Sequence, residues 1–221
     1  MFVSPNTLEI CVDASLITIN DRVFTCSGAV CLETYEDIYL VTPDSTNNKG
    51  ELLAVYLGCQ MAIKYRLFNN YDKIHIYSDS QFAVLGLRDW MEKWITTTDE
   101  KGVIYNSSSK PVKNYQLFQM IISYCVTNNL IVNLYNQKGH VNTNSEASMA
   151  QANKQFKDAN GILLGYDDLK RITDGNNYID LKTKQVLQSI IPTTYRPIIH
   201  TEGNIQMVHY AQYDNFKKFI K

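Results

Sequence analysis

Near the N-terminus, hydrophobic residues gather in short runs that are typical of β-strands. The runs are rich in β-branched and aromatic residues, and short polar segments separate them. Because the runs follow one another closely, they predict three consecutive strands that form a meander. The predicted strands are "LEICVDAS" (residues 8–15), "RVFTCSGAVCLET" (22–34) and "DIYLVTP" (37–43).

After the third predicted strand, the spacing of hydrophobic residues changes to that of a helix. Residues 48–67 carry an apolar stripe at helical spacing that includes Leu52, Val55 and Cys59, which predicts a largely buried helix. Further along the chain, strand patterns and helix patterns alternate. They predict a strand over 73–80, a helix over 80–94, an amphipathic helix over 114–128 and a strand over 130–138.

Three strands, a helix and then alternating strands and helices predict an α/β fold with a mixed five-stranded sheet that helices flank. The pattern changes after about residue 155. There the sequence predicts a small α+β extension: two short helices around the Asp-Gly pair within 165–192, a hairpin over 196–212 and a short amphipathic helix over 213–221. We therefore expect a domain of residues 1–156 and an accessory module of residues 157–221.

Composition narrows the class of protein only a little. A chain of 221 residues with 45% hydrophobic residues can bury a full core, and a net charge of −1 indicates no strong overall attraction to polyanions. The five cysteines include no C-x-x-C pair, the N-terminus lacks a signal-peptide pattern, and no apolar run is long enough for a membrane span. These features predict reduced thiols, a cytoplasmic location and no membrane partner.

Three carboxylates carry the strongest chemical signal. Asp13 follows an apolar run inside the first predicted strand, where an ionised group is costly unless a cation or hydrogen-bond donors meet it. Glu51 and Asp79 begin predicted helices, and each also has a structural interpretation. "Asn48-Lys-Gly-Glu51" and "Ser78-Asp79-Ser80-Gln81" have the spacing of capping boxes, and Asp13 is also suited to capping a turn at a strand end.

Taken together, the three acids favour a metal site over three unrelated caps. They lie on a first strand, in the first turn of the helix after the meander, and at the end of the next strand, which are places that converge at one edge of a sheet. Divalent cations such as Mg²⁺ prefer carboxylate oxygens, and two such ions can support phosphodiester hydrolysis. The pattern therefore predicts a divalent-metal site.

Four motifs in this order resemble those of the ribonuclease H family, type 1. They are "VDAS", "TNNKGEL", "SDSQ" and "KGH", with "DWMEKW" and "KPVKNYQLF" as two further matches, and the resemblance covers about residues 6–156. It implies that Asp13, Glu51 and Asp79 hold two Mg²⁺ ions, with Mn²⁺ as an alternative metal. It also implies that His140 assists proton handling or product release, so that the catalytic residues are Asp13, Glu51, Asp79 and His140.

The same resemblance implies a set of residues that bind an RNA–DNA hybrid. Asn47, Asn48 and Gln81 would contact the minor groove, where the ribose 2′-hydroxyls are displayed. Thr46 and Asn114 would hold a phosphate of the DNA strand beside Trp90 and Trp94, and Ser15 would also contact the substrate. Without the resemblance, the two tryptophans have the spacing of an ordinary stabilising pair on a helix, and the asparagines that of cap and turn residues.

The resemblance is weaker at the expected fourth acid. The family pattern "N-E-x-A-D" aligns with Asn144-Ser-Glu-Ala-Ser148, so Ser148 takes the place of the acid as a weak metal ligand. The leading hypothesis is an endoribonuclease that hydrolyses the RNA strand of RNA–DNA hybrids with two metal ions. The alternatives are a hybrid-binding protein that is inactive or strongly impaired, and an enzyme of this fold that acts on another duplex. Residues 157–221 would bind the hybrid or a protein partner.

Overall fold

The computed structural model describes residues 6–19, 21–69, 71–95, 104–106, 108–190 and 206–207. The predicted mixed sheet of five strands is confirmed, and a sixth strand of two residues extends it. The spatial order is β5-β4-β1-β2-β3-β6. The strands are β1 (Thr7–Ile19), β2 (Arg22–Cys31), β3 (Asp37–Pro43), β4 (Lys73–Ser78), β5 (Asn133–Asn136) and β6 (Gln206–Met207).

Strands β1, β2 and β3 form the predicted antiparallel meander, whereas β4 and β5 run parallel to β1. Because β1 is the central strand of the five, its side chains alternate between two buried faces of the sheet. Leu8, Ile10 and Val12 belong to the core under α1 (Asn47–Phe68), and Cys11 belongs to the core on the opposite face. Asp13 shares the face of Cys11.

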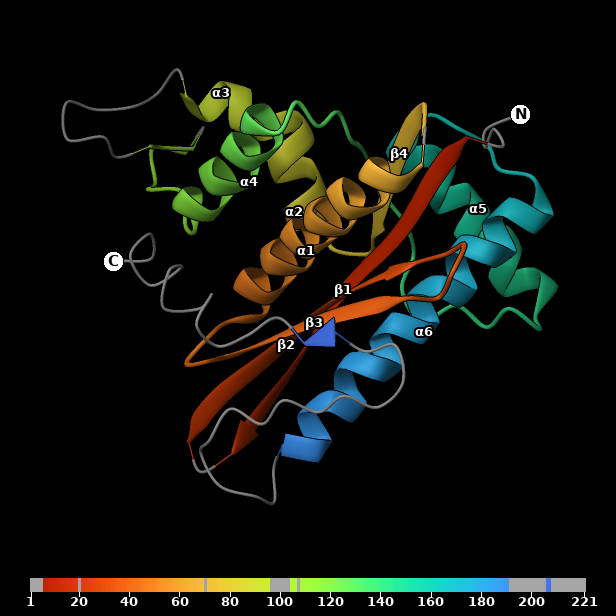
Figure 1. Cartoon of the computed structure of the whole chain (residues 1–221), viewed down its shortest axis with the longest axis horizontal. Coiled ribbons are helices and arrows are strands. Elements are labelled where there is room, and N and C mark those ends of the chain that lie inside the picture. The colour runs from red at the N-terminus through yellow and green to blue at the C-terminus, as the bar shows by residue number, and fades with distance from the viewer. Residues whose placement is uncertain are drawn as a thin grey trace.

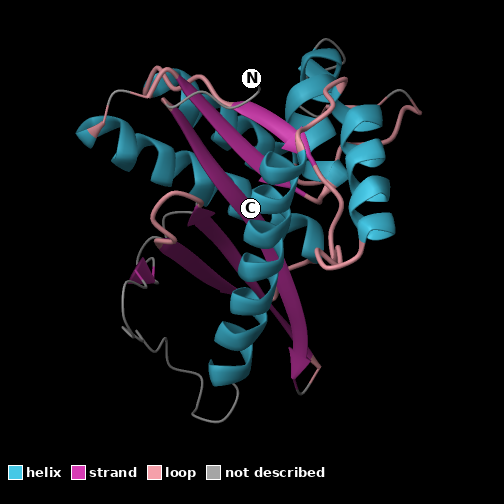
Figure 2. Cartoon of the chain, turned by 90° about the vertical axis from the view of Figure 1, so that its right-hand side faces the viewer, coloured by secondary structure: helices cyan, strands magenta, loops and turns pink. Residues whose placement is uncertain are grey.

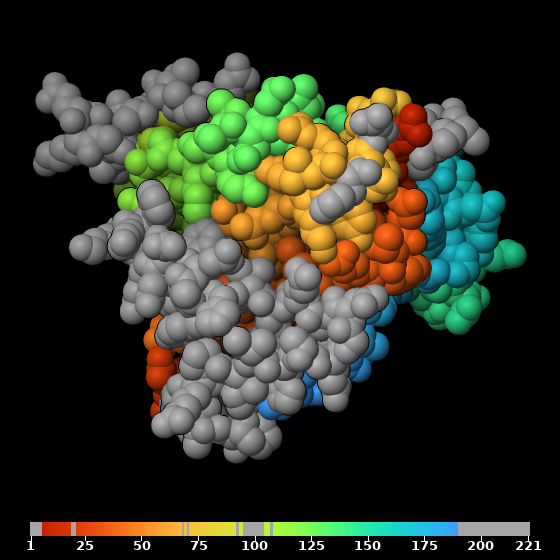
Figure 3. Space-filling model, viewed as in Figure 1, coloured from red at the N-terminus to blue at the C-terminus, as the bar shows by residue number. Residues whose placement is uncertain are grey.

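Helices cover both faces (Figure 1). The face under α1 also carries a nearly continuous helical run, made of α2 (Gln81–Leu85), a π-helical turn η1 (Gly86–Trp90) and α3 (Met91–Ile95), together with α4 (Tyr115–Thr127). In Figure 3, α4 (green) lies beside α1 (orange) at the molecular surface. No helix in the described part of the chain is both long and apolar enough to cross a membrane.

The opposite face is covered by α5 (Glu146–Asn160) and α6 (Tyr166–Ile190). The prediction of two short helices within 165–192 is wrong, because a single long helix crosses the sheet there (Figure 2). Gly175 is not a turn residue but a point of close approach. A Cβ at Gly175 would overlap Leu32 Cδ2 and lie 3.0 Å from Cys11 Sγ, so only glycine lets α6 approach the sheet this closely.

The sheet makes room for α6 in the same way. A Cβ at Gly28 of β2 would lie 2.7 Å from Thr183 Cγ2 and 2.9 Å from Ile179 Cδ1. The buried residues Ile172, Ile179 and Leu187 of α6 belong to the core on this face of the sheet. The described part of the predicted accessory module therefore packs directly on the sheet.

The proposed boundary at residue 156 falls within α5, and the division into a domain and an accessory module stays a prediction. Strand β6 lies within the predicted hairpin, where it pairs in parallel with β3. The rest of the hairpin, like the predicted helix over 213–221, lies outside the described residues.

Candidate active site

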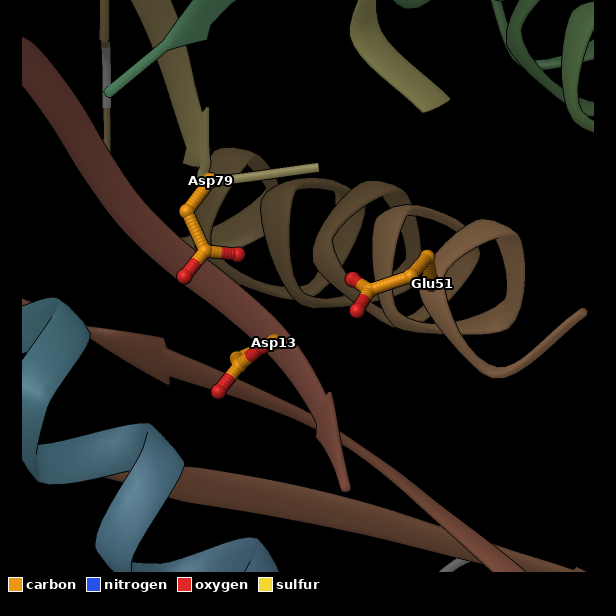
Figure 4. Close-up of side chains that lie close together, drawn as sticks. All are labelled: Asp13, Glu51 and Asp79. Atoms are coloured by element: carbon orange, nitrogen blue, oxygen red, sulfur yellow. The ribbon is translucent and has the colours of Figure 1, made fainter. Parts of the chain in front are cut away.

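Asp13, Glu51 and Asp79 converge at the edge of the sheet where β1 and β4 meet the start of α1. Each offers one carboxylate oxygen such that these oxygens all lie within 4.8 Å of one another. Figure 4 shows the three side chains pointing toward a common space from β1, α1 and the end of β4. The structure thus brings together the three acids that the sequence singled out.

The structure also decides against the capping interpretations. The N-cap of α1 is Thr46, whose hydroxyl accepts a hydrogen bond from the Lys49 amide at 3.3 Å, so Glu51 does not cap the helix. Ser80 caps α2 by accepting from the Ala83 amide. Asp13 lies within β1 rather than at a turn, and its Oδ1 accepts from the Ala14 amide at 2.8 Å. The three carboxylates are therefore free for another role.

Electrostatics makes this cluster costly without a cation. Burial and the neighbouring Asp79 raise the pKa of Asp13 to about 8, and burial with Asp13 and Asp79 raises the pKa of Glu51 to about 9. Burial also raises the pKa of Asp79. Glu51 Oε2 is buried without a hydrogen-bond partner. Buried oxygens of like charge with an unsatisfied acceptor suit a hard divalent cation.

A fourth carboxylate, which the sequence did not single out, reaches the same pocket from α6. The pocket has a volume of about 480 Å³, and Asp180 lines it together with Asp13, Glu51 and Asp79. Asp180 Oδ2 lies 3.6 Å from His140 Nδ1, and Lys184, one turn further along α6, approaches both Asp180 oxygens at 2.7 Å. Helix α6 therefore contributes an acid and a cation to the pocket.

Ser148 does not reach this pocket. It lies in the first turn of α5, and its Oγ accepts a hydrogen bond from the Asn142 amide at 3.2 Å. Helix α5 packs beside β5, where Asn160 Nδ2 donates to the Asn136 carbonyl at 2.7 Å and Phe156 stacks on Tyr135. This docking keeps α5 beside β5, so Ser148 does not line the pocket in which a weak metal ligand was expected.

The sequence around Asp180 has the spacing expected around the fourth acid. Asn176-Asn-Tyr-Ile-Asp180 places an asparagine and an aspartate at the first and fifth positions, as the pattern sought at residues 144–148 requires. Asn176 is buried, and its Nδ2 donates to Asp79 Oδ2 at 3.4 Å. Its Oδ1 accepts from Gln137 Nε2 at 2.9 Å. Asn176 therefore positions Asp79, while Asp180 enters the pocket.

Comparison with known proteins agrees with this geometry. The family model described as RNase H matches residues 5–156. The chain belongs to the RNase H family. Ribonuclease H of Hahella chejuensis (strain KCTC 2396) is 35% identical over 96 residues, which are 42% of this chain and 57% of that protein. Ribonuclease H of Marinobacter nauticus is 29% identical over 118 residues, 53% of this chain and 71% of that protein.

The chain thus spans less than two thirds of the length of the first of these relatives. Among solved structures it is similar to LC9-RNase H1, described as a type 1 RNase H with the type 2 active-site motif. That similarity has a TM-score of 0.42 at 15% identity and covers 80% of this chain and 86% of the other. The RNase H match ends at residue 156, before α6 begins, so it does not include Asp180.

Two of the expected substrate contacts line the pocket. Asn47 lines it and donates through Nδ2 to Glu51 Oε1 at 3.4 Å. Ser15 also lines it, but its hydroxyl is buried and shares a hydrogen bond of 2.7 Å with Thr183 of α6. Ser15 therefore helps to hold α6 in place.

The other expected contacts lie outside the pocket. Thr46 and Asn48 are exposed at the start of α1, and Gln81 is exposed at the start of α2. Asn114 precedes α4 with a φ of 60° and makes no side-chain capping bond. The Trp90 and Trp94 rings lie 5.8 Å apart, with Trp94 buried against Phe118 and Trp90 exposed.

His140 lies at the rim of the pocket on a loop. Its side chain is 73% exposed and its φ is 53°, a left-handed conformation that is uncommon outside glycine. The preceding Gly139 lies so close to Asp79 that a Cβ there would overlap Asp79 Oδ2. This close approach brings the exposed imidazole of the neighbouring His140 to the rim of the carboxylate pocket.

Proposed function

We propose that this chain is a divalent-metal-dependent endoribonuclease that hydrolyses the RNA strand of RNA–DNA hybrids. The observation that carries the proposal is the meeting of four carboxylates, Asp13, Glu51, Asp79 and Asp180, in one pocket of an RNase H-family fold. Such a cluster is unfavourable when empty, and it has the oxygen donors that Mg²⁺ or Mn²⁺ prefers. The relatives that carry the name ribonuclease H support the same activity.

These four carboxylates would hold two Mg²⁺ ions, or Mn²⁺ in their place. When bound, such a pair activates a water nucleophile and stabilises the leaving oxygen of a phosphodiester. His140 is exposed at the pocket rim beside Asp180, where its imidazole nitrogens are placed to accept or donate a proton. Asn176 holds Asp79 in orientation through the 3.4 Å hydrogen bond.

The surface around the pocket supports this substrate class. Asn47 lies in the pocket, and Asn48 and Gln81 are exposed beside it at the starts of α1 and α2. Amide side chains can hydrogen-bond both base edges and 2′-hydroxyl groups in a minor groove. Trp90, Trp94 and Asn114 would contact the DNA strand further along the same duplex.

Cleavage assays on matched duplexes test this function. The full chain is incubated with end-labelled RNA–DNA, RNA–RNA and DNA–DNA duplexes in Mg²⁺, in Mn²⁺ and in EDTA, alongside Asp13→Asn. We expect cleavage of the RNA in the hybrid alone, with 3′-hydroxyl and 5′-phosphate ends, and none in EDTA or with Asp13→Asn. Hybrid binding without cleavage in either metal would instead identify a non-catalytic binding protein, and cleavage of RNA–RNA would identify a different substrate.

The predicted accessory role of residues 157–221 now applies to only part of that segment. We propose that α6 belongs to the catalytic unit, because it supplies Asp180 to the pocket and packs on the sheet. Binding of a protein partner or of the hybrid by the remaining C-terminal residues stays a prediction.

A further inference from the structure

An apolar groove lies on the α1 face of the sheet, at the edge formed by β5. It has a volume of about 500 Å³, and α1, α4, η1 and the segment leading into β5 line it. Most of its lining is aliphatic, including Val55, Ile121 and Leu134. Two cysteines, Cys59 of α1 and Cys125 of α4, are also among the residues that line the groove, and Cys125 is the more exposed of the two.

These two thiols face each other across the contact between α1 and α4. Their Sγ atoms lie 3.7 Å apart, and a thiol hydrogen bond joins them. Both are free cysteines, Cys59 fully buried and Cys125 partly exposed. A disulfide requires an S–S distance of about 2.0 Å, so the sulfurs need to approach by less than 2 Å for a bond to form, which a small side-chain adjustment provides.

Contacts on both sides of the thiols hold the two helices together. The rings of Tyr56 and Tyr124 pack edge to face with centroids 4.9 Å apart. Toward the C-terminal end of α1, Arg66 donates through its guanidinium to the carbonyls of Asn128 and Asn129 at 2.9 and 2.6 Å. The thiol pair lies between these two anchors in sequence, so α1 and α4 keep the sulfurs facing each other.

The other three cysteines provide a contrast within the same chain. Cys11, Cys26 and Cys31 are fully buried in the sheet. Cys11 donates to the Ile172 carbonyl at 3.4 Å and Cys26 to the Ser27 carbonyl at 3.9 Å, and burial raises the pKa of both thiols. By contrast, the hydrogen bond between Cys125 and Cys59 lowers the pKa of Cys125, which favours the thiolate form that reacts with oxidants.

We propose that Cys59 and Cys125 form an oxidisable dithiol that hydrogen peroxide converts to an intramolecular disulfide linking α1 to α4. The Cys125 thiolate attacks one peroxide oxygen, the O–O bond breaks, and hydroxide leaves, so that Cys125 becomes a sulfenic acid. The Cys59 sulfur then attacks the Cys125 sulfur, the S–O bond breaks, and water leaves. The two sulfurs together give up two electrons, and one peroxide becomes two waters, with the thiol protons included.

The site is independent of the proposed ribonuclease activity, because it lies outside the carboxylate pocket. The expected consequence of the disulfide is a change in thermal stability. A covalent bond between α1 and α4 constrains the unfolded chain over the long segment between positions 59 and 125, so the oxidised protein should melt at a higher temperature than the reduced protein.

Thiol mapping of the full chain tests the proposal. The reduced protein is treated with increasing hydrogen peroxide under native conditions, quenched, unfolded and alkylated, and then analysed by intact mass and peptide mapping. We expect the loss of two of the five alkylatable thiols, a cross-linked peptide that contains Cys59 and Cys125, and full reversal by dithiothreitol. The melting temperature should rise with the cross-linked fraction and fall again on reduction.

Single variants show which cysteine reacts with peroxide and which then forms the disulfide. Cys59→Ala should leave a sulfenic acid on Cys125 that dimedone traps, whereas Cys125→Ala should leave Cys59 largely unreacted at the same peroxide concentration. Cys31→Ala is the matched control and should form the wild-type cross-link. The mapping of the wild-type protein needs no variant, so a folding defect in any of them leaves the test intact.

Two results would overturn the proposal. One is oxidation of Cys125 to sulfinic acid in the wild-type protein without a cross-link to Cys59. The other is oxidation that is spread evenly over all five cysteines, which would indicate that peroxide reacts only with unfolded protein.

Discussion

His140 Nδ1 lies 3.6 Å from Asp180 Oδ2, although the two residues come from a loop after β5 and from the middle of α6. This pairing links the loop histidine of the RNase H resemblance to a helix outside the matched region of residues 5–156. The pocket is therefore built by the matched region and by the segment that follows it.

Asp180→Asn should reduce hybrid cleavage by roughly 100-fold or more, because it removes a charge from the pocket where the metal would bind. Ser148→Ala should change the rate by less than about 2-fold, since Ser148 Oγ only accepts the Asn142 amide bond. Steady-state kinetics in Mg²⁺ measures both variants. A large loss for Ser148→Ala with normal activity for Asp180→Asn would reverse the assignment.

Gly139→Ala should impair the site without unfolding the protein. The added Cβ would overlap Asp79 Oδ2, so either the carboxylate or the loop that carries His140 must shift. Such a shift of a proposed metal ligand should lower Mn²⁺ affinity and cleavage by about 10-fold or more. Isothermal titration with Mn²⁺ checks the affinity. Gly165→Ala is the control, because a Cβ there meets no atom within 4 Å, and it should bind Mn²⁺ normally.

The metal-free protein should lose stability as the pH rises from about 4.5 to about 9. In the folded state the pKa of Glu51 is raised to about 9, above its ordinary value of 4.5, so the folded state binds protons more tightly than the unfolded state. Stability is therefore fully present below pH 4.5 and falls as the pH rises through the folded pKa. The pKa of Asp13, raised to about 8, acts in the same direction.

Glu51→Gln should remove part of this loss and stabilise the metal-free protein at pH 9 by about 2–4 kcal/mol. Urea unfolding in EDTA at a series of pH values measures the effect. Asp158→Asn provides a comparison, because Asp158 is an exposed acid paired with Lys154 on α5 and should leave the pH dependence unchanged. Equal pH slopes for wild type and Glu51→Gln would contradict the prediction.

Gly175→Ala should destabilise the whole domain. The new methyl group would overlap Leu32 Cδ2 and crowd Cys11 Sγ, so α6 would have to move off the sheet. Overpacking of this kind costs about 1–3 kcal/mol, which outweighs the higher helix propensity of alanine. Denaturant unfolding gives the free energy. Because α6 carries Asp180, cleavage should fall as well, whereas stabilisation by Gly175→Ala would show that α6 does not pack on the sheet in solution.

The strand meander, the buried helix after it and the three acids at Asp13, Glu51 and Asp79 could all be predicted from the sequence. Periodicity in a strand or helix depends on neighbours a few residues apart, and so the sequence shows it directly. The family assignment was also accessible, because the motifs around these acids occur in the expected order, and the family match confirms it.

The choice between Ser148 and Asp180 depended on the tertiary structure. The sequence contains the same spacing twice, at Asn144 to Ser148 and at Asn176 to Asp180, and spacing alone does not say which helix crosses the sheet. Packing decides it. Asn160 holds α5 beside β5, while Gly28 and Gly175 let α6 lie close against β1 and β2, which places Asp180 over the carboxylates. Such contacts join residues that are far apart in the chain, so no local sequence pattern predicts them.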